Sequence, residues 1–383
     1  MRLRTLPIVL AFFVMGFVDS VGVLVGYARE QFQLRATTAG LLPFFGFAAF
    51  ALVSVPAGVL AARRGRKSVL VLGLTLVLAG ELLPVVSLSR YGYLLAAIFL
   101  VGVGMTVLQV AGNPLMRDVS EPGRYARNLT FAQFVKSLGS NAAPYLVPLV
   151  AALGWGWTAV FPLFALVAAL DLALVWGLEI AEQPSEGPTA SVKSSFALLG
   201  DRYIAGVVLG IFLYVGAEVG VNSWAATHLQ RSFGMELDSA TRWLGLFLGG
   251  LALGRLLGSA ALSFLSPRRF FLLAAASGTL AVAGLLVPSR PVVLACLFLA
   301  GLAFSNIWPV VFALAIEERP GRASELSGLM CMAIFGGALL PLAMGWLADS
   351  FSARWAFLVP LGCFAYLLLL ALAAPRPPRT HEA

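Results

Sequence analysis

Long apolar runs follow one another along almost the whole chain, and short polar or basic segments separate them. Each run has about 20 residues or more, the length that a helix needs to cross roughly 30 Å of hydrocarbon. With 60% hydrophobic and only 11% charged residues, the 383-residue chain has more apolar side chains than a soluble domain can bury. We therefore predict an all-α integral membrane protein with twelve transmembrane helices. The predicted spans are residues 6–28, 38–62, 68–88, 92–115, 128–153, 156–178, 203–228, 240–264, 269–288, 291–315, 323–348 and 354–374.

The basic residues are divided unevenly between the two sides of such a bundle. If residue 1 lies in the cytoplasm, seventeen of the 26 Lys and Arg residues fall on that side and seven on the other, with Lys136 and Arg255 inside spans. Loops rich in Lys and Arg stay in the cytoplasm. The pattern predicts cytoplasmic N- and C-termini, in what we expect to be a bacterial cytoplasmic membrane. Contact with anionic lipid then explains the net charge of +8, and no nucleic acid partner is expected.

A polar linker divides the predicted spans into six and six. The segment EIAEQPSEGPTASVKSSFALLG (179–200) has the Pro, Ser, Gly and charge of a linker. We predict two pseudo-symmetric six-helix bundles, at 1–178 and at 203–383 with a short cytoplasmic tail, joined by a cytoplasmic linker at 179–202. Four residues in or just before the fifth span support the symmetry, because they recur in the eleventh at a constant offset of 197. They are Ala126, Leu129, Gly139 and Pro144, which recur as Ala323, Leu326, Gly336 and Pro341.

Residue patterns for catalysis or metal binding are missing from the sequence. Cys296, Cys331 and Cys363 all lie within apolar runs, without the spacing of metal ligands. We find no phosphate-binding glycine loop, no zinc pattern and no plausible nucleophile triad. We therefore expect no enzyme activity, no cofactor and no metal. The expected partners are the lipid bilayer and a small-molecule solute, and the expected functional unit is a monomer.

Three charged residues lie deep inside predicted spans. At about 1.5 Å per residue, Asp19 lies about 20 Å into the first span and Glu218 about 22 Å into the seventh, while Arg255 is similarly deep in the eighth. A charge at the bilayer centre costs about 2.5–3.5 kcal/mol on insertion scales, so such groups face protein or water. Asp19 and Glu218 are the candidates for proton coupling. A static ion pair of either acid with Lys136 or Arg255 is the alternative.

Polar residues of several spans fall on single helical faces. Five of them in the fifth span, from Gln133 to Asn141, follow the i, i+3, i+4, i+7, i+8 pattern of one stripe. Such a stripe cannot face lipid, so we expect it to face the axis of the bundle. Interhelical hydrogen bonding is the alternative role for the amides. The candidate substrate-binding residues are Gln109, Asn113, Gln133, Lys136, Asn141, Asn222, Trp224, Arg255 and Asn306.

Four prolines lie within predicted spans, where each removes a backbone hydrogen-bond donor. Helices of membrane proteins tolerate such breaks where other groups satisfy the freed carbonyl. We predict that all four interrupt their helices. They are Pro114, Pro144, Pro309 and Pro341.

The loop after the second span reads PAGVLAARRGRKS (56–68). It resembles the loop signature of the major facilitator superfamily, a glycine followed by a basic Arg-Arg-x-Gly-Arg-Lys cluster, although Ala62 stands about where that signature usually has an acid. Further elements, spread over nearly the whole chain, resemble the fucose–proton symporter family of that superfamily. They are LQVAGNPLM (108–116), NLTFAQFVKSLGS (128–140), GAEVGVNSW (216–224) and GRLLGS (254–259). The resemblance implies the major facilitator fold and proton-driven import of a sugar or related small polar solute by alternating access.

Three positions depart from the pattern of that family. Gln109 stands where the family has a glutamate, Glu218 where it has a glutamine, and Lys136 where it has an asparagine. The first-span carboxylate of the family lies about one helical turn from Asp19, which makes Asp19 the first candidate for the proton carrier. The titratable groups are thus rearranged, and the substrate is not carried over from the family.

Three alternatives stay open at the level of function. A proton-antiporting exporter of drugs or other lipophilic compounds can use the same fold. Its cavity would be mostly apolar and aromatic, whereas the amide-rich stripes favour a hydrogen-bonded substrate. Sodium is the alternative coupling ion, because carboxylate and amide oxygens also ligate it. Lys136 has two candidate partners, the carboxylate of an anionic sugar or one of the acids Asp19 and Glu218.

Overall fold

The structure is a computed structural model that describes residues 5–17, 21–35, 38, 41–183 and 190–373. These residues form helices and connecting loops, and no β-strand occurs among them. The helices of the N-terminal half are α1 (Leu6–Met15), α2 (Val21–Gln31), α4 (Leu41–Arg64), α5 (Arg66–Val86), α6 (Tyr91–Asp118), α7 (Tyr125–Ser140), α8 (Ala143–Ala152) and α9 (Val160–Trp176).

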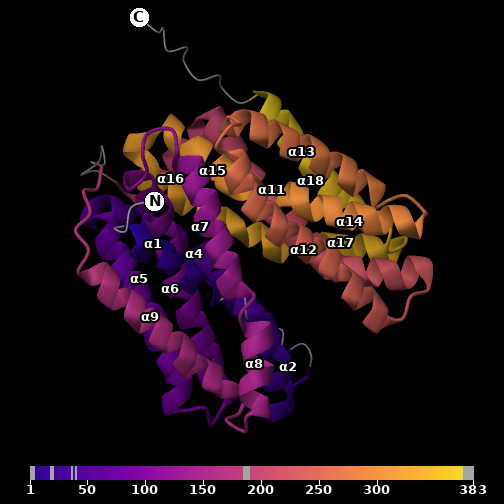
Figure 1. Cartoon of the computed structure of the whole chain (residues 1–383), viewed down its shortest axis with the longest axis horizontal. Coiled ribbons are helices and arrows are strands. Elements are labelled where there is room, and N and C mark those ends of the chain that lie inside the picture. The colour runs from indigo at the N-terminus through magenta and orange to yellow at the C-terminus, as the bar shows by residue number, and fades with distance from the viewer. Residues whose placement is uncertain (1–4, 18–20, 36–37, 39–40, 184–189, 374–383) are drawn as a thin grey trace, which may run out of the picture.

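The linker carries the short helix α10 (Val192–Ala197), and the C-terminal half follows it (Figure 1). The helices of that half are α11 (Arg202–Phe233), α12 (Leu237–Ala261), α13 (Pro267–Gly284), α14 (Arg290–Phe304), α15 (Ile307–Glu318), α16 (Ala323–Met332), α17 (Gly336–Ser350) and α18 (Leu358–Ala373). Short 3₁₀ turns complete the chain at η3 (Trp157–Ala159), η4 (Leu198–Gly200), η5 (Pro320–Arg322), η6 (Ala333–Phe335) and η7 (Trp355–Phe357).

The helices confirm the predicted all-α membrane fold. Nine stretches of helix within the described part of the chain are long and apolar enough to cross a membrane. The other three predicted spans correspond to α1 with α2, to α7 with α8, and to α13. Outward-facing leucines and tryptophans along these helices remain exposed, as expected for side chains that contact lipid.

Two spans are broken close to a proline, as predicted. Asn141 and Ala142 separate α7 from α8, and Pro144 lies in the first turn of α8. Ser305 and Asn306 separate α14 from α15, whose first turn holds Pro309. Both breaks lie at mid-span, where backbone and side-chain polar groups become available to a cavity in the protein.

The other two predicted interruptions are wrong, because Pro114 and Pro341 lie inside the continuous helices α6 and α17. A proline leaves the carbonyl four residues earlier without its helical donor. In α6 this carbonyl belongs to Val110, and Ser327 of α16 donates to it from Oγ at 2.7 Å. A side chain of the opposite half thus replaces the missing bond, so that α6 continues through Pro114.

Equivalent helix crossings show the predicted symmetry of the halves. A Cβ atom added to Gly139 of α7 would lie 2.1 Å from the carbonyl oxygen of Phe13 in α1. A Cβ atom added to Gly336 of α17 would lie 2.1 Å from the carbonyl oxygen of Phe212 in α11. Because only glycine permits such close backbones, the first and fifth spans pack in the same way as the seventh and eleventh.

The two halves hold together at one end of the molecule, which we call the closed end. There α4 packs on α16, and a Cβ atom added to Gly58 would lie 2.6 Å from the carbonyl oxygen of Ser324. Arg66 is 2% exposed, pairs with Asp118 of its own half, and donates from Nε to Ser324 Oγ at 3.1 Å. Toward α2 and α8 the halves diverge, and we call this end the open end (Figure 1).

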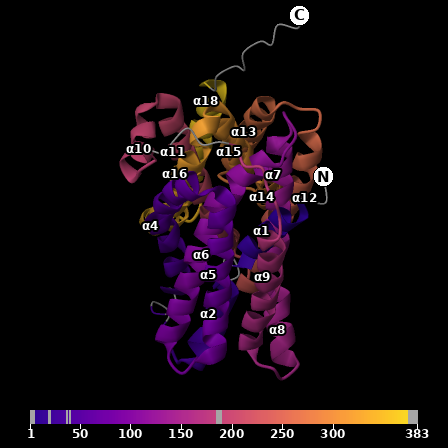
Figure 2. The same cartoon turned by 90° about the vertical axis from the view of Figure 1, so that its left-hand side faces the viewer.

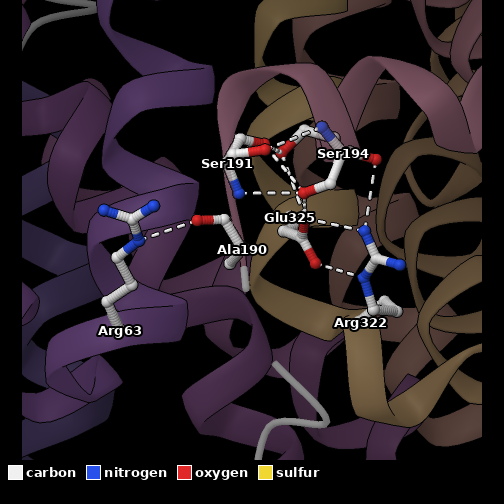
Figure 3. A network of polar contacts seen from close by, with 7 residues as sticks. Arg63, Ala190, Ser191, Ser194, Arg322 and Glu325 are labelled. Atoms are coloured by element: carbon white, nitrogen blue, oxygen red, sulfur yellow. Dashed lines mark hydrogen bonds and ion pairs between the residues drawn. The ribbon is translucent and has the colours of Figure 1, made fainter. Parts of the chain in front are cut away.

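The linker contacts both halves at the closed end, where α10 lies near α16 (Figure 2). Arg63 of α4 donates from Nε to the Ala190 carbonyl oxygen at 2.7 Å. Ser194 donates from Oγ to Glu325 Oε1 at 2.7 Å, and Arg322 donates to the Glu325 carboxylate and, at 3.2 Å, to the Ser194 carbonyl oxygen (Figure 3). The linker is therefore one more connection that holds this end shut.

Candidate functional site

A cavity of about 590 Å³ lies between the two halves. Its wall takes side chains from α2, α4, α6 and α7 of the N-terminal half and from α11, α12 and α15 of the C-terminal half. The volume falls within the range of small-molecule binding sites. Because both halves contribute to the wall, a ligand in the cavity contacts both of them at once.

The exposure of the wall decreases from the open end toward the closed end. Asn141, just after α7, and Asn222 of α11 are exposed, and Glu218, one turn before Asn222, is 21% exposed. Gln109 of α6 and Gln133 of α7 are only 4% and 7% exposed. The cavity is therefore accessible from the open end, and its floor lies at Gln109 and Gln133.

Most of the predicted site residues line this cavity together. They come from the fourth, fifth, seventh and eighth spans, which are far apart in the sequence. Asp19, predicted for proton coupling, lies outside the described residues. The predicted residues that line the cavity are Gln109, Gln133, Lys136, Asn141, Glu218, Asn222 and Arg255.

The polar stripe of the fifth span faces the cavity, as predicted from its periodicity. Ser137 and Ser140 line the wall together with Lys136 and Asn141. Ser140 donates from Oγ to the Lys136 carbonyl oxygen at 3.2 Å, and Asn141 donates from Nδ2 to the Ser137 carbonyl oxygen at 2.7 Å. The Ser137 carbonyl also accepts from the Asn141 backbone N–H at 3.0 Å, so the amide side chain adds a second hydrogen bond at the end of α7.

Three predicted binding residues lie away from the cavity wall. Asn306 donates from Nδ2 to the Gly254 carbonyl oxygen at 2.6 Å and so joins the tenth span to α12. Trp224 donates from Nε1 to the Pro341 carbonyl oxygen at 3.1 Å and joins α11 to α17. Asn306 thus makes the interhelical hydrogen bond that was the alternative to ligand binding for the amides. Asn113 is fully buried on α6, closer to the closed end than the cavity floor.

Glu218 and Arg255 form an ion pair on the cavity wall. Arg255 Nη2 of α12 lies 3.5 Å from Glu218 Oε1 of α11, and the two side chains are 22% and 21% exposed. The pair is one of the alternatives that the sequence leaves open for these charges. Because both side chains stay partly accessible from the cavity, a ligand or a proton can reach them.

The hydroxyl of Tyr214 contacts two acceptors and has only one proton. It lies against Glu218 Oε2 and also 2.9 Å from the Phe304 carbonyl oxygen at the end of α14. A carbonyl oxygen only accepts, and an ionised carboxylate also only accepts. If the hydroxyl proton is directed to the Phe304 carbonyl, the contact with Glu218 is a full hydrogen bond only when Glu218 carries a proton and donates it to Tyr214 Oη. Glu218 therefore has one arrangement that suits the ionised form, the pair with Arg255, and one that suits the protonated form.

The phenylalanine side chains of the wall were not predicted. Phe47 and Phe50 of α4 and Phe247 of α12 line the cavity beside the polar stripes. Within an apolar span, a ring that faces a cavity has the same sequence pattern as a ring that faces lipid or the core. No periodic signal in these spans distinguishes the cavity-facing rings.

A helical bundle in two similar halves, with a cavity of mixed polar and apolar lining between them that is accessible from one end, is the architecture of a membrane transporter. Among the described residues, no group of three or more His, Cys, Asp or Glu is placed to hold a metal ion. The family model of the Major Facilitator Superfamily matches residues 8–286 and 207–383. The chain therefore belongs to the Major Facilitator Superfamily and is a transporter rather than an enzyme.

Named relatives match along nearly their whole length. The glucose/galactose transporter of Brucella abortus biovar 1 (strain 9-941) is 32% identical over 378 residues, which cover 95% of this chain and 92% of the relative. The putative glucose/galactose transporter of Helicobacter pylori (strain J99) is 30% identical, with 94% of each chain covered. The L-fucose-proton symporter of Escherichia coli (strain K12) is 23% identical, with 91% of this chain and 87% of the relative covered.

Solved structures of this superfamily share the fold. The transporter FucP in the outward conformation superposes with a TM-score of 0.87 at 20% identity, over 98% of this chain and 99% of that chain. The proton:xylose symporter XylE gives a TM-score of 0.74 at 15% identity, over 97% and 95% of the two chains. Together with the sequence match to an L-fucose-proton symporter, these structures confirm the resemblance that the sequence motifs indicate.

Proposed function

We propose that the protein imports a sugar or a related small polar solute together with protons, by alternating access. The observation that carries the proposal is the cavity, in which amide and hydroxyl groups of both halves surround the Arg255–Glu218 pair. Amides and hydroxyls both donate and accept, which suits a ligand that bears many hydroxyl groups. The names of the relatives, glucose/galactose transporters and an L-fucose-proton symporter, support the same substrate class.

The proposed orientation has the closed end in the cytoplasm and the cavity accessible from outside. Arg63, Arg66 and Arg322 all lie at the closed end. Basic loops stay in the cytoplasm, so a substrate enters this conformation from the outer side of a bacterial cytoplasmic membrane. We place both termini in the cytoplasm and treat the monomer as the functional unit.

Transport then requires the closed end to open while the open end shuts. Opening breaks the Ser327–Val110 and Arg66–Ser324 hydrogen bonds and the linker contacts of Glu325. A ligand that contacts both halves favours the state in which they close around it, because it binds that state more tightly. No cofactor is needed, since the ion gradient supplies the energy.

Glu218 is the proposed proton-binding residue among the described residues, and Asp19 stays the first candidate from the sequence. In the ionised form, Glu218 holds Arg255 in an ion pair. In the protonated form, it completes the chain through Tyr214 to the Phe304 carbonyl, and Arg255 becomes free to bind hydroxyl oxygens of the ligand. Protonation and sugar binding thereby support each other, as a symporter requires.

The experiment that tests this function is uptake into proteoliposomes with an imposed proton gradient, inside alkaline. The panel contains glucose, galactose, fucose and a hexuronate, because an anionic sugar becomes the expected substrate if Lys136 contacts a carboxylate. Accumulation of one of these sugars that follows the proton gradient supports the proposal. Extrusion of lipophilic compounds without sugar uptake supports the exporter instead. Sugar accumulation that follows only a sodium gradient identifies sodium, not the proton, as the coupling ion.

A further inference from the structure

Two fully buried polar side chains lie beyond the cavity floor without a partner. The Asn113 amide, through both Nδ2 and Oδ1, and the Thr130 hydroxyl make no hydrogen bond to any residue that the structure describes. Both residues are 0% exposed. Most buried polar side chains in proteins have at least one hydrogen-bond partner. These two therefore need a reason to be polar.

Both residues continue the polar stripes of the cavity toward the closed end. Asn113 follows the floor residue Gln109 by four positions in α6, which is about 6 Å along a helix, and Thr130 precedes Gln133 by three positions in α7, which is about 4.5 Å. The two helices pack together, and the short segment 119–124 joins them at the closed end, so they run in opposite directions. Asn113 and Thr130 consequently lie at one level, one turn beyond the floor.

This level belongs to the contact between the halves that shuts the closed end. Val110, one turn before Asn113 in α6, accepts the hydrogen bond from Ser327 of the opposite half. On the other side, α7 packs against α12 and α15 of the opposite half. When the halves separate at this end, the faces that carry Asn113 and Thr130 become accessible from it.

We propose that Asn113 and Thr130 form an inner binding subsite that a polyol such as a hexose occupies on its way out through the closed end; this rests on the proposed function. The Asn113 amide donates and accepts, and so does the Thr130 hydroxyl, which matches the neighbouring hydroxyl groups of a sugar ring. With the end closed, these groups stay buried without partners. Their desolvation therefore favours opening once the gate contacts are weakened.

The test combines cysteine labelling with release of the gate. Asn113→Cys and Thr130→Cys are made in a protein whose Cys296, Cys331 and Cys363 are replaced by serine, and vesicles expose the closed end to a membrane-impermeant thiol reagent. Ala111→Cys of α6 and Ala132→Cys of α7 are the matched controls, because both positions are also 0% exposed but lie off the polar stripe. Each variant is measured with and without Ser327→Ala, which removes one gate contact without any sugar.

We expect the gate variant to raise the labelling of Asn113→Cys and Thr130→Cys about tenfold and that of the controls far less, because labelling follows the population of the open state. Glucose or galactose in the closed-end compartment should then slow the labelling at both positions. Labelling at the control rate overturns the proposal. Labelling that rises but is unaffected by a sugar that the protein transports also overturns it.

The outcome stays separate from that of the proposed function. The increase in labelling caused by Ser327→Ala needs no sugar. It therefore reports only whether the two positions become accessible from the closed end. If neither sugar is transported in the uptake assay, the proposed function fails, and the assignment of a polyol to the subsite fails with it. If sugars are transported and protect neither cysteine, only the subsite fails.

Discussion

Glu218 shows how one carboxyl group near the middle of a membrane can have two stable arrangements. Arg255 at 3.5 Å favours the charge, while the chain through Tyr214 to the Phe304 carbonyl is complete only with a proton in place. A purely structural ion pair requires only the first of these arrangements. In the proposed mechanism, the second arrangement would hold the coupling proton on the cavity wall, near the solute that enters from the open end.

Glu218→Gln is expected to uncouple transport. The amide keeps the size and the hydrogen bonding of the side chain but cannot release a proton. With a gradient of one pH unit, the wild type reaches about tenfold accumulation at one proton per sugar, whereas the variant reaches a ratio of about one, because 1.4 kcal/mol corresponds to a factor of ten. Exchange of labelled sugar across the membrane is expected to persist, since it needs no net proton movement.

Uptake and exchange in the same proteoliposomes measure this difference. Glu236→Gln is the matched control, because Glu236 is exposed at the start of α12 and does not line the cavity. If Glu218→Gln still concentrates the sugar, Glu218 is not the coupling residue and Asp19 becomes the single candidate. Asp19→Asn is then measured in the same assay.

Tyr214→Phe tests whether the tyrosine acts through Glu218. If the hydroxyl acts only by accepting the hydrogen bond of protonated Glu218, Tyr214→Phe and Glu218→Gln remove the same step. Their losses of coupled uptake should then not add in the double variant. Tyr366→Phe is the matched control, because Tyr366 Oη also donates to a helix carbonyl, that of Gly206, at 2.9 Å but lies off the cavity. Its effect should add to that of Glu218→Gln. Additive effects in the Tyr214 cycle would show that the tyrosine acts independently.

At the scale of the elements, Pro114 is the reason for a hydrogen bond between α6 and α16. The proline deprives the Val110 carbonyl of its helical donor, and Ser327 of the opposite half supplies another. The hydrogen bond forms only while the closed end is shut. Because of the proline, the Val110 carbonyl of α6 has this donor only while the C-terminal half is in its present position.

Ser327→Ala is expected to weaken the closed end. It leaves the Val110 carbonyl buried without a donor, which costs about 1–3 kcal/mol, so the population with that end open should rise about 5- to 150-fold. Fluorescent labels at the exposed positions Arg124 and Arg319, one in each half, report the separation of the halves. Ser277→Ala is the control, because Ser277 donates to the Leu273 carbonyl of its own helix on an exposed face of α13. Equal label separations in the two variants would contradict the gating role of Ser327.

The sequence predicts the helices better than the contacts between them. Length and hydropathy predict twelve spans, and the 3.6-residue period predicts the stripe from Gln133 to Asn141 that faces the cavity. The continuity of α6 through Pro114 was not predictable, because the replacement donor, Ser327, comes from a helix more than 200 residues away. For the same reason the sequence could not separate Asn306 and Trp224, which join helices, from Asn222 and Arg255, which line the cavity.

At the scale of the molecule, the structure is closed at one end and open at the other, which makes it one of the two states of the proposed alternating access. The halves are held at the closed end by the glycine crossing of α4 and α16, by Arg66, and by the linker contacts of Glu325. The cavity is accessible from the opposite end, and the buried residues Asn113 and Thr130 lie one helical turn beyond its floor. These contacts are individually small, so a ligand that bridges the halves can shift the balance between the two states.

The most direct test of the account follows protons and sugar together. Purified protein is reconstituted into vesicles that contain a pH-sensitive dye, with equal pH on both sides and no sodium, and a sugar that passes the uptake screen is added outside. Proton-coupled import through Glu218 predicts that sugar entry acidifies the lumen in wild-type vesicles, while Glu218→Gln vesicles exchange sugar without acidification. Sugar entry without any pH change in wild-type vesicles would contradict proton-coupled import.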